Sequence, residues 1–299
     1  MVCQRWRSAA TFAVLIVALP FVAACEPGRP TDAGTASAQA SSPAEPPITV
    51  EVNQSRDQYG KPAILIQLTN TTDSSLVVSG AEVHSGLFDG DITWKAADGA
   101  LELPPRQPKS LPANLPAAAC AQAATGPATA TVHYLHNTKE PWETTTQASD
   151  PFNVLPRNSD ELCLSADAAA IASIVLDPQL EVAPDGSTAV VHLLITPAST
   201  ATSSAFTIES IDGTTLLAEP PSDPWPRNIV VPSSTATQVV PLRIRPARCD
   251  PHAVAEDKVG TLLPLKVTVG KRNGLLKVAA PTELKGRIYD FVTAACSER

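Results

Sequence analysis

The stretch Ala63-Ile-Leu-Ile-Gln-Leu-Thr69 returns, in altered form, as Ala189-Val-Val-His-Leu-Leu-Ile-Thr196 in the second half of the chain. The first begins 57 residues before Cys120, and the second begins 60 residues before Cys249. The next cysteine follows 43 residues later in the first half and 47 residues later in the second. Because the same features recur in the same order at nearly the same spacing, the sequence predicts an internal duplication and two tandem domains.

Both domains are expected to consist of short strands. Runs of β-branched and aliphatic residues alternate with turn dipeptides such as Asp185-Gly186 and Asn273-Gly274. The 29 prolines and 14 glycines disfavour long helices. We expect strands at 48–52, 63–69, 76–78, 91–95, 129–135, 152–155, 174–176, 189–196, 206–211, 229–231, 239–244, 265–269 and 275–279. About seven short strands per domain predict an all-β protein of two immunoglobulin-like β-sandwiches, at 48–165 and 166–299.

The first 24 residues have the parts of an export signal. Arg5 and Arg7 are followed by an apolar run from 9 to 24 that contains Pro20. This run is shorter than the roughly 20 apolar residues of a spanning helix. It ends in Val22-Ala-Ala-Cys25, which resembles the lipobox of bacterial lipoproteins. The resemblance implies diacylglyceryl transfer to Cys25, cleavage before it, and a chain anchored to the outer face of the cytoplasmic membrane.

Cysteine parity favours the same interpretation over ordinary cleavage after Ala24. Removal of the signal leaves five cysteines, an odd number for an exported protein. Lipidation of Cys25 leaves four, which allow three connectivities. The duplication selects Cys120–Cys163 and Cys249–Cys296, one bridge in each domain, as structural disulfides of an oxidising compartment.

Residues 25–47 are expected to form a disordered tether, because they are rich in Pro, Ala, Ser and Thr and poor in large apolar side chains. The formal net charge is −8, and loss of the two signal-peptide arginines makes it −10. A chain this acidic has no electrostatic footprint for nucleic acid. It also lacks a basic patch for anionic lipid, so the lipid must provide the attachment to the membrane.

The segment Cys249-Asp-Pro-His-Ala-Val-Ala-Glu-Asp-Lys258 predicts a helix of about two turns, with Asp250 as N-cap and Gly260 as terminator. On such a helix His252 and Glu256 share one face, with Asp257 beside them. The three define either a solvated connector helix, a binding surface, or a metal or proton-transfer site. No further ligand is identifiable, so we predict no metal site. The segment resembles one in uncharacterised secreted proteins of actinobacteria, which implies an exported setting.

Trp142 and Trp225 lie in proline-rich stretches, Lys-Glu-Pro-Trp-Glu and Ser-Asp-Pro-Trp-Pro. Together with Trp94 they fit two interpretations: one core tryptophan per domain, or exposed anchors for a partner.

The sequence contains no G-x-S-x-G, no H-E-x-x-H and no phosphate-binding glycine-rich loop. We therefore expect no catalytic residues and no cofactor, and a non-catalytic surface lipoprotein that binds a protein or cell-wall component. The alternative is an exported hydrolase acting on envelope or extracellular substrates through the loops of one domain. A solute-binding lipoprotein fits less well, because that class alternates strands and helices in two lobes.

The anchor yields a direct prediction. Cells that express the wild-type chain should incorporate a labelled lipid precursor into it, and cells that express Cys25→Ala should not, because the acceptor thiol is missing. The measurement is label recovered on the purified chain. An unlabelled wild-type chain would contradict the lipobox interpretation.

Overall fold

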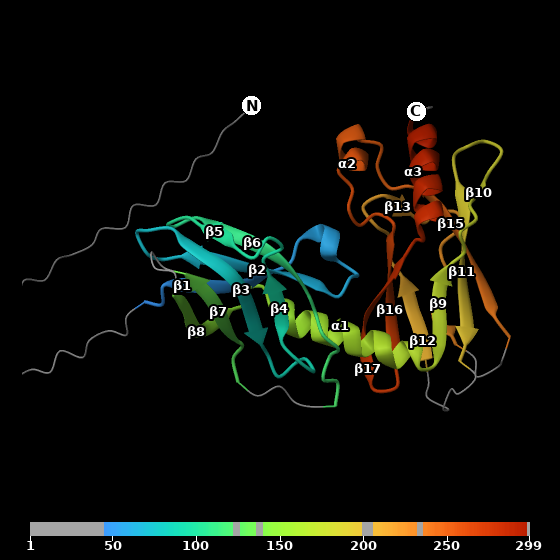
Figure 1. The fold of residues 1–299 in the computed structure, drawn as a ribbon. Coiled ribbons are helices and arrows are strands. Elements are labelled where there is room, and N and C mark those ends of the chain that lie inside the picture. The colour runs from blue at the N-terminus through green and yellow to red at the C-terminus, as the bar shows by residue number, and fades with distance from the viewer. Residues whose placement is uncertain (1–44, 122–125, 136–139, 199–205, 232–235, 298–299) are drawn as a thin grey trace, which may run out of the picture. The chain divides into compact units, whose positions relative to one another are not determined.

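The computed structural model describes residues 45–121, 126–135, 140–198, 206–231 and 236–297. The predicted signal peptide, Cys25 and the tether up to residue 44 lie outside these residues. Within the described residues, no helix is long and apolar enough to cross a membrane. The chain from Glu45 to Arg299 forms one compact unit that contains two β-sandwiches, coloured blue to green and yellow to red in Figure 1.

Eight strands build the first sandwich. They are β1 (Ile48–Asn53), β2 (Ala63–Asn70), β3 (Leu76–His84), β4 (Ile92–Lys95), β5 (Leu101–Leu103), β6 (Pro108–Asn114), β7 (Thr129–Leu135) and β8 (Pro141–Ser149). β1, β2 and β6 form one layer, and β3, β4, β5, β7 and β8 form the other. β8 joins the two layers by pairing in parallel with β1.

The alternation of buried and exposed side chains along the strands determines which residues form the core of this sandwich. Ile48, Val50 and Val52 of β1 are buried, and so are Ile64 and Ile66 of β2. Since successive side chains of a strand point to opposite faces, every second residue faces the other layer. Each fully buried aliphatic side chain contributes about 1.5–3 kcal/mol relative to exposure.

Nine strands build the second sandwich. They are β9 (Ala172–Leu176), β10 (Glu181–Val182), β11 (Ala189–Pro197), β12 (Phe206–Ile211), β13 (Leu217–Ala218), β14 (Ile229–Val230), β15 (Gln238–Pro246), β16 (Leu262–Val269) and β17 (Arg272–Ala279). One sheet has the order β10-β11-β15-β13, with β9 also on β11, and the other has the order β14-β12-β16-β17. Phe206, Leu193 and Ile195 are among the largest fully buried side chains between the sheets.

The two sandwiches repeat one plan. The pairings β1-β2-β6 and β3-β7-β8 of the first recur as β9-β11-β15 and β12-β16-β17 in the second. Each copy ends in a sixteen-residue helix, α1 (Val154–Ala169) or α3 (Thr282–Ser297). A disulfide joins each helix to the segment after β6 or β15, through Cys120–Cys163 and Cys249–Cys296. The predicted all-β pair of sandwiches and both predicted disulfides are therefore confirmed.

The two sixteen-residue helices correct the expectation that the many prolines and glycines disfavour long helices. A strand was expected at 152–155, but α1 begins at Val154 because the Asp150 carboxylate accepts the Val154 N–H at 2.7 Å and the Leu155 N–H at 2.9 Å. Pro156 lies in the first helical turn, where a missing N–H costs nothing. The boundary expected between 165 and 166 falls inside this helix.

Helix α1 contributes to both hydrophobic cores. Val154 and Leu155 pack in the core of the first sandwich, whereas Leu164 and Ala168 pack in the core of the second. Lys277 of β17 also forms a largely buried ion pair with Glu161 of α1, with 2.6 Å between Nζ and Oε1. The helix that ends the first copy is therefore part of the packing of the second.

Removal of either disulfide should destabilise the protein. Each bridge closes a loop of more than forty residues, so the chain-entropy model gives a loss of about 4 kcal/mol in the free energy of unfolding for Cys120→Ala with Cys163→Ala, and likewise for the second pair. Urea unfolding followed by circular dichroism measures this loss. Cys25→Ala is the control, and an unchanged midpoint in either double variant would contradict the structural role of that bridge.

Candidate functional site

The predicted helix after Cys249 is present but short. Helix α2 (Pro251–Ala255) begins with Asp250 as N-cap, whose carboxylate accepts the His252 N–H at 3.0 Å, and with Pro251 at the first position. It ends after five residues rather than two turns, with Glu256 as C-cap. Glu256 still lies one turn beyond His252, because its N–H donates to the His252 carbonyl at 2.9 Å.

Asp257 is turned away from this pair and holds the segment to the rest of the second sandwich. Its carboxylate accepts the Gly260 N–H at 2.8 Å, the Thr215 hydroxyl at 2.6 Å and the Tyr289 hydroxyl at 2.8 Å. Gly260 is buried, and a Cβ there would collide with Leu216 and with the Asp257 carboxylate. The expected group of His252, Glu256 and Asp257 is therefore divided: the first two are exposed, and the third ties α2 to α3.

Tyr289 of α3 is held as a neutral phenol. Burial raises its pKa above the ordinary value, and the hydrogen bond to Asp257 and the negative charge of that carboxylate raise it further. Each effect favours the uncharged form. Asp257 and Tyr289 thus form a fixed polar contact in which the hydroxyl donates and the carboxylate accepts.

A cleft of about 580 Å³ lies between α2 and α3. We call it the α2–α3 cleft. Val254 and Ala255 line it from α2, Val292 and Thr293 line it from α3, and the Cys249–Cys296 disulfide lines it between the helices. Asp257 and Tyr289 are its charged and phenolic lining residues. The volume lies in the range of ligand-binding pockets, and the mixture of apolar walls with a few polar groups is typical of them.

Among the described residues, the structure shows no group of three or more His, Cys, Asp or Glu side chains that could hold a metal ion. His252 and Glu256 lie beside the α2–α3 cleft rather than among its lining residues. What the segment offers chemically is therefore an apolar recess with hydrogen-bonding groups.

The tryptophans divide between the two interpretations. Trp225 is only 3% exposed and belongs to the second core, and Trp94 packs against the first. Trp225 is therefore a core residue and not an exposed anchor, which corrects its place among the candidate binding residues. Trp142 of β8 is 54% exposed, as an anchor would have to be.

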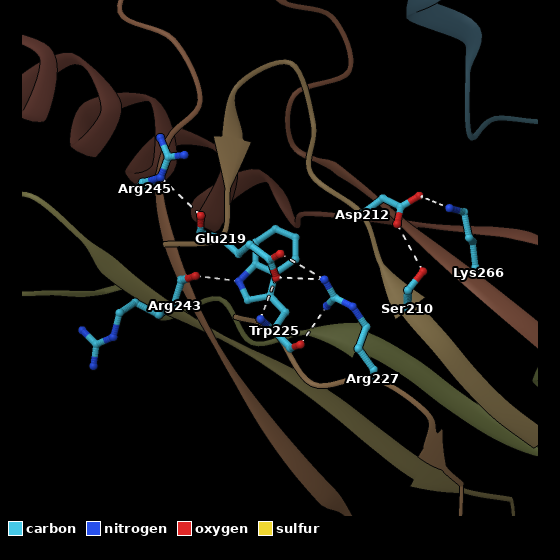
Figure 2. Close-up of polar contacts among 8 residues, drawn as sticks. All are labelled: Ser210, Asp212, Glu219, Trp225, Arg227, Arg243, Arg245 and Lys266. Atoms are coloured by element: carbon cyan, nitrogen blue, oxygen red, sulfur yellow. Dashed lines mark hydrogen bonds and ion pairs between the residues drawn. The ribbon is translucent and has the colours of Figure 1, made fainter. Parts of the chain in front are cut away.

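Figure 2 shows what holds the proline-rich loop around Trp225 in place. The Glu219 carboxylate accepts the Trp225 N–H at 2.7 Å and pairs with the Arg227 guanidinium at 3.0 Å. The Trp225 indole N–H donates to the Arg243 carbonyl at 2.6 Å, and Arg245 donates to the Glu219 carbonyl at 3.2 Å. The same view shows Asp212 bound to Ser210 and Lys266. The contacts of Glu219 and of the Trp225 indole hold the loop to β15, and the Asp212–Lys266 ion pair is a separate contact with β16.

Sequence reasoning missed Tyr289 because it missed α3. The signal was present: Leu284, Ile288, Phe291, Val292 and Ala295 recur at helical spacing and are all buried. No comparable signal marks Glu219, because its partners come from a loop and from β15.

No family model matches this chain, and no curated protein matches it. Solved structures show weak similarity. The YadV chaperone is 12% identical, with 77% of this chain and 100% of that chain covered and a TM-score of 0.21. The Escherichia coli chaperone DraB is 10% identical, with 79% and 97% covered and a TM-score of 0.21. Red sea bream transglutaminase is 10% identical, with 79% and 31% covered and a TM-score of 0.23. These similarities identify no family and no function for this chain.

The contact between Asp257 and Tyr289 can be measured by titration. Of the three tyrosines in the chain, Tyr289 should ionise above the ordinary phenol range, and Asp257→Asn should lower its pKa because the negative charge next to the hydroxyl is removed. Absorbance of phenolate against pH gives the curve, and Tyr289→Phe identifies the late step by its loss. Identical curves for wild type and Asp257→Asn would contradict the contact.

Proposed function

We propose that this protein is a non-catalytic, lipid-anchored protein of the bacterial envelope that binds another envelope protein through the α2–α3 cleft. It is attached through Cys25 to the outer face of the cytoplasmic membrane. The catalytic alternative, an exported hydrolase, has no comparable support in the arrangement of the described residues.

The lipid anchor is supported by the Val22-Ala-Ala-Cys25 sequence and by the pairing of the other cysteines. The four cysteines after Cys25 form two disulfides, one in each copy of the fold. Cys25 is thus the cysteine of the exported chain that takes part in neither bridge. Attachment of a lipid through a thioether accounts for this remaining cysteine. Two or more acyl chains provide stable attachment, whereas a single chain gives only marginal binding.

The observation that carries the binding function is the α2–α3 cleft. It is an addition to the duplicated plan, because α2 lies between β15 and β16 and the structure shows no helix at the corresponding described positions between β6 and β7. Val254, Val292 and the disulfide give it apolar walls, so an apolar side chain that enters it is removed from water, at about 25 cal/mol per Å² of area buried. A recess built on two helices tied by a disulfide and by Asp257 is preformed, which lowers the ordering cost of binding.

The chemistry of the cleft favours a protein over a sugar and binding over catalysis. Among the described residues that line the cleft, Tyr289 is the one aromatic residue, and its hydroxyl is already bound to Asp257. Asp257 in turn accepts hydrogen bonds from the Thr215 hydroxyl and the Gly260 N–H. A carboxylate occupied in this way is a poor general base, whereas apolar walls suit a leucine- or valine-sized side chain of a partner protein.

Site-specific crosslinking in cells tests the proposed binding site. A photoreactive amino acid at Thr293, which is exposed and lines the cleft, should form an adduct with an envelope protein identifiable by mass spectrometry. The same group at Ala97, an exposed residue of the first sandwich, is the matched control. Ala255→Trp fills the cleft and should reduce the adduct by about tenfold, which corresponds to about 1.4 kcal/mol.

Equal adducts at both positions, or no adduct at either, would contradict the proposed site. Turnover of ester, peptide or glycoside substrates by the chain, abolished by His252→Ala, would instead support the hydrolase.

A further inference from the structure

Strand β10 is an open edge of the second sandwich. Among the described residues it pairs only with β11, as Glu181 opposite Val190 and Val182 opposite Ala189. The Ala183 N–H donates to the Thr188 carbonyl at 2.9 Å, so 183 and 188 are a hydrogen-bonded pair. Hydrogen-bonded and non-hydrogen-bonded pairs alternate along an antiparallel ladder. The N–H and C=O of Val182 therefore point away from β11, where a further strand would lie.

A second cleft, of about 500 Å³, lies between this edge and α3. We call it the β10–α3 cleft. Leu180 and Val182 line it from the β10 side, and Phe291 and Ala294 line it from the helix. Val182 is 51% exposed. Residues opposite each other share one face of a sheet, and Ala189 is fully buried. The Val182 side chain is therefore on the inner face of the sheet.

The two clefts lie on different faces of α3. Residues 289, 292, 293, 296 and 297 line the α2–α3 cleft, whereas 287, 290, 291, 294 and 295 line the β10–α3 cleft. At 100° per residue the centres of these two sets are on nearly opposite sides of the helix. An occupant of one cleft therefore need not touch the other, so binding at the β10–α3 cleft does not depend on the proposed function.

A positively charged side chain, that of Arg287, lies at the β10–α3 cleft. Arg287 lines it and donates to the amide oxygen of Gln179 at 2.8 Å, which is a neutral acceptor. No ion pair of Arg287 occurs among the described residues. Asp290 also lines the cleft but forms no ion pair with Arg287, so the guanidinium keeps donors for an acidic group of a partner, and such a pair is a strong hydrogen bond when bidentate.

The β10 hairpin is preformed. The Asp185 carboxylate accepts the Ser187 N–H at 3.1 Å and the Ser187 hydroxyl at 2.8 Å. These hydrogen bonds lower the pKa of Asp185, so the carboxylate remains ionised and the turn remains closed. The edge therefore needs little ordering before a second strand pairs with it.

We propose that the open edge of β10 binds an extended peptide segment of a partner protein as an added strand. The segment pairs with the Val182 N–H and C=O, inserts an apolar side chain between Val182 and Ala294, and places an acidic side chain against Arg287. Backbone pairing at an exposed edge combined with a side-chain pocket is an established mode of peptide recognition.

Strand β14 offers the matched control. The Val231 N–H donates to the Phe206 carbonyl at 2.9 Å, so by the same alternation the N–H of Val230 also points outward. Val230 is opposite Thr207 and is 66% exposed. Replacement of Val230 by proline removes the same group from an edge of the other sheet, without altering β10.

The probe is a phage-displayed library of random twelve-residue peptides, selected on the chain Glu45–Arg299, which contains both cores and both disulfides. Selected peptides should carry apolar residues at alternate positions and at least one Asp or Glu. Proline is tolerated on edge strands, so the Val182→Pro variant should fold. Its affinity for a selected peptide, measured by fluorescence anisotropy, should be about tenfold lower or more, equal to about 1.4 kcal/mol. The affinity of the Val230→Pro variant for the same peptide should remain within about twofold of wild type, a change of about 0.4 kcal/mol. Arg287→Glu should lower the affinity for peptides that carry Asp or Glu.

Several results would overturn the proposal. These are no selected peptide above background, equal binding by wild type and Val182→Pro, or equal losses for both proline variants. A wild-type dimer in sedimentation equilibrium that Val182→Pro dissociates would assign the edge to a second copy of this chain instead. If the thermal melt shows that Val182→Pro is unfolded, Ala294→Glu is the decisive variant. It blocks the cleft from an exposed helix position, and unchanged peptide binding would overturn the proposal.

Discussion

Both sandwiches depend on helix α1, which is packed into two cores at once. The Cys120–Cys163 bridge holds the middle of the helix to the first sandwich, while Leu164 and Ala168, directly beyond that cysteine, are buried in the second. Arg272 of β17 strengthens the connection, because its guanidinium binds Asp167 of the helix at 2.7 Å and the Cys120 carbonyl at 3.0 Å. Loss of α1 would remove apolar side chains from both cores, so the two copies of the fold are expected to be coupled in stability.

The second copy repeats this helix with different chemistry. When Cys163 and Cys296 are aligned, Asn158 and Ser159 of α1 correspond to Phe291 and Val292 of α3. Asn158 is buried and bonded to Gln54 of the first sandwich, whereas Phe291 and Val292 are apolar and pack in the second core. Together with the added helix α2, this exchange gives α3 an apolar environment on two faces. The proposed binding surfaces thus occur in the copy whose helix has apolar residues at these two positions.

Much of the fold could be predicted from local sequence. The strands expected at 129–135 and 206–211 coincide with β7 and β12, because β-branched runs bounded by turns report the period of a strand directly. Helix α1 was missed because its start depends on Asp150, four residues upstream, and because the many prolines of the chain were expected to disfavour long helices. Of the candidate site residues, His252 and Glu256 remain exposed, Asp257 is bound inward, and Trp225 is buried. Tyr289, which binds Asp257, is 32 residues away in the chain, and Arg243, which binds the Trp225 indole, is 18 residues away, beyond the reach of local patterns.

The sequence by itself determined the number of β-sandwiches, their strand composition and the pairing of four cysteines. These properties follow from periodicity, spacing and duplication, which are read along the chain. Tertiary structure alone decided which face of α3 lies against α2 and which face lies against β10. It also decided that the N–H and C=O of Val182 point away from β11. Those outcomes depend on packing between segments far apart in sequence, where buried area and hydrogen bonds select one arrangement among many that the local sequence allows.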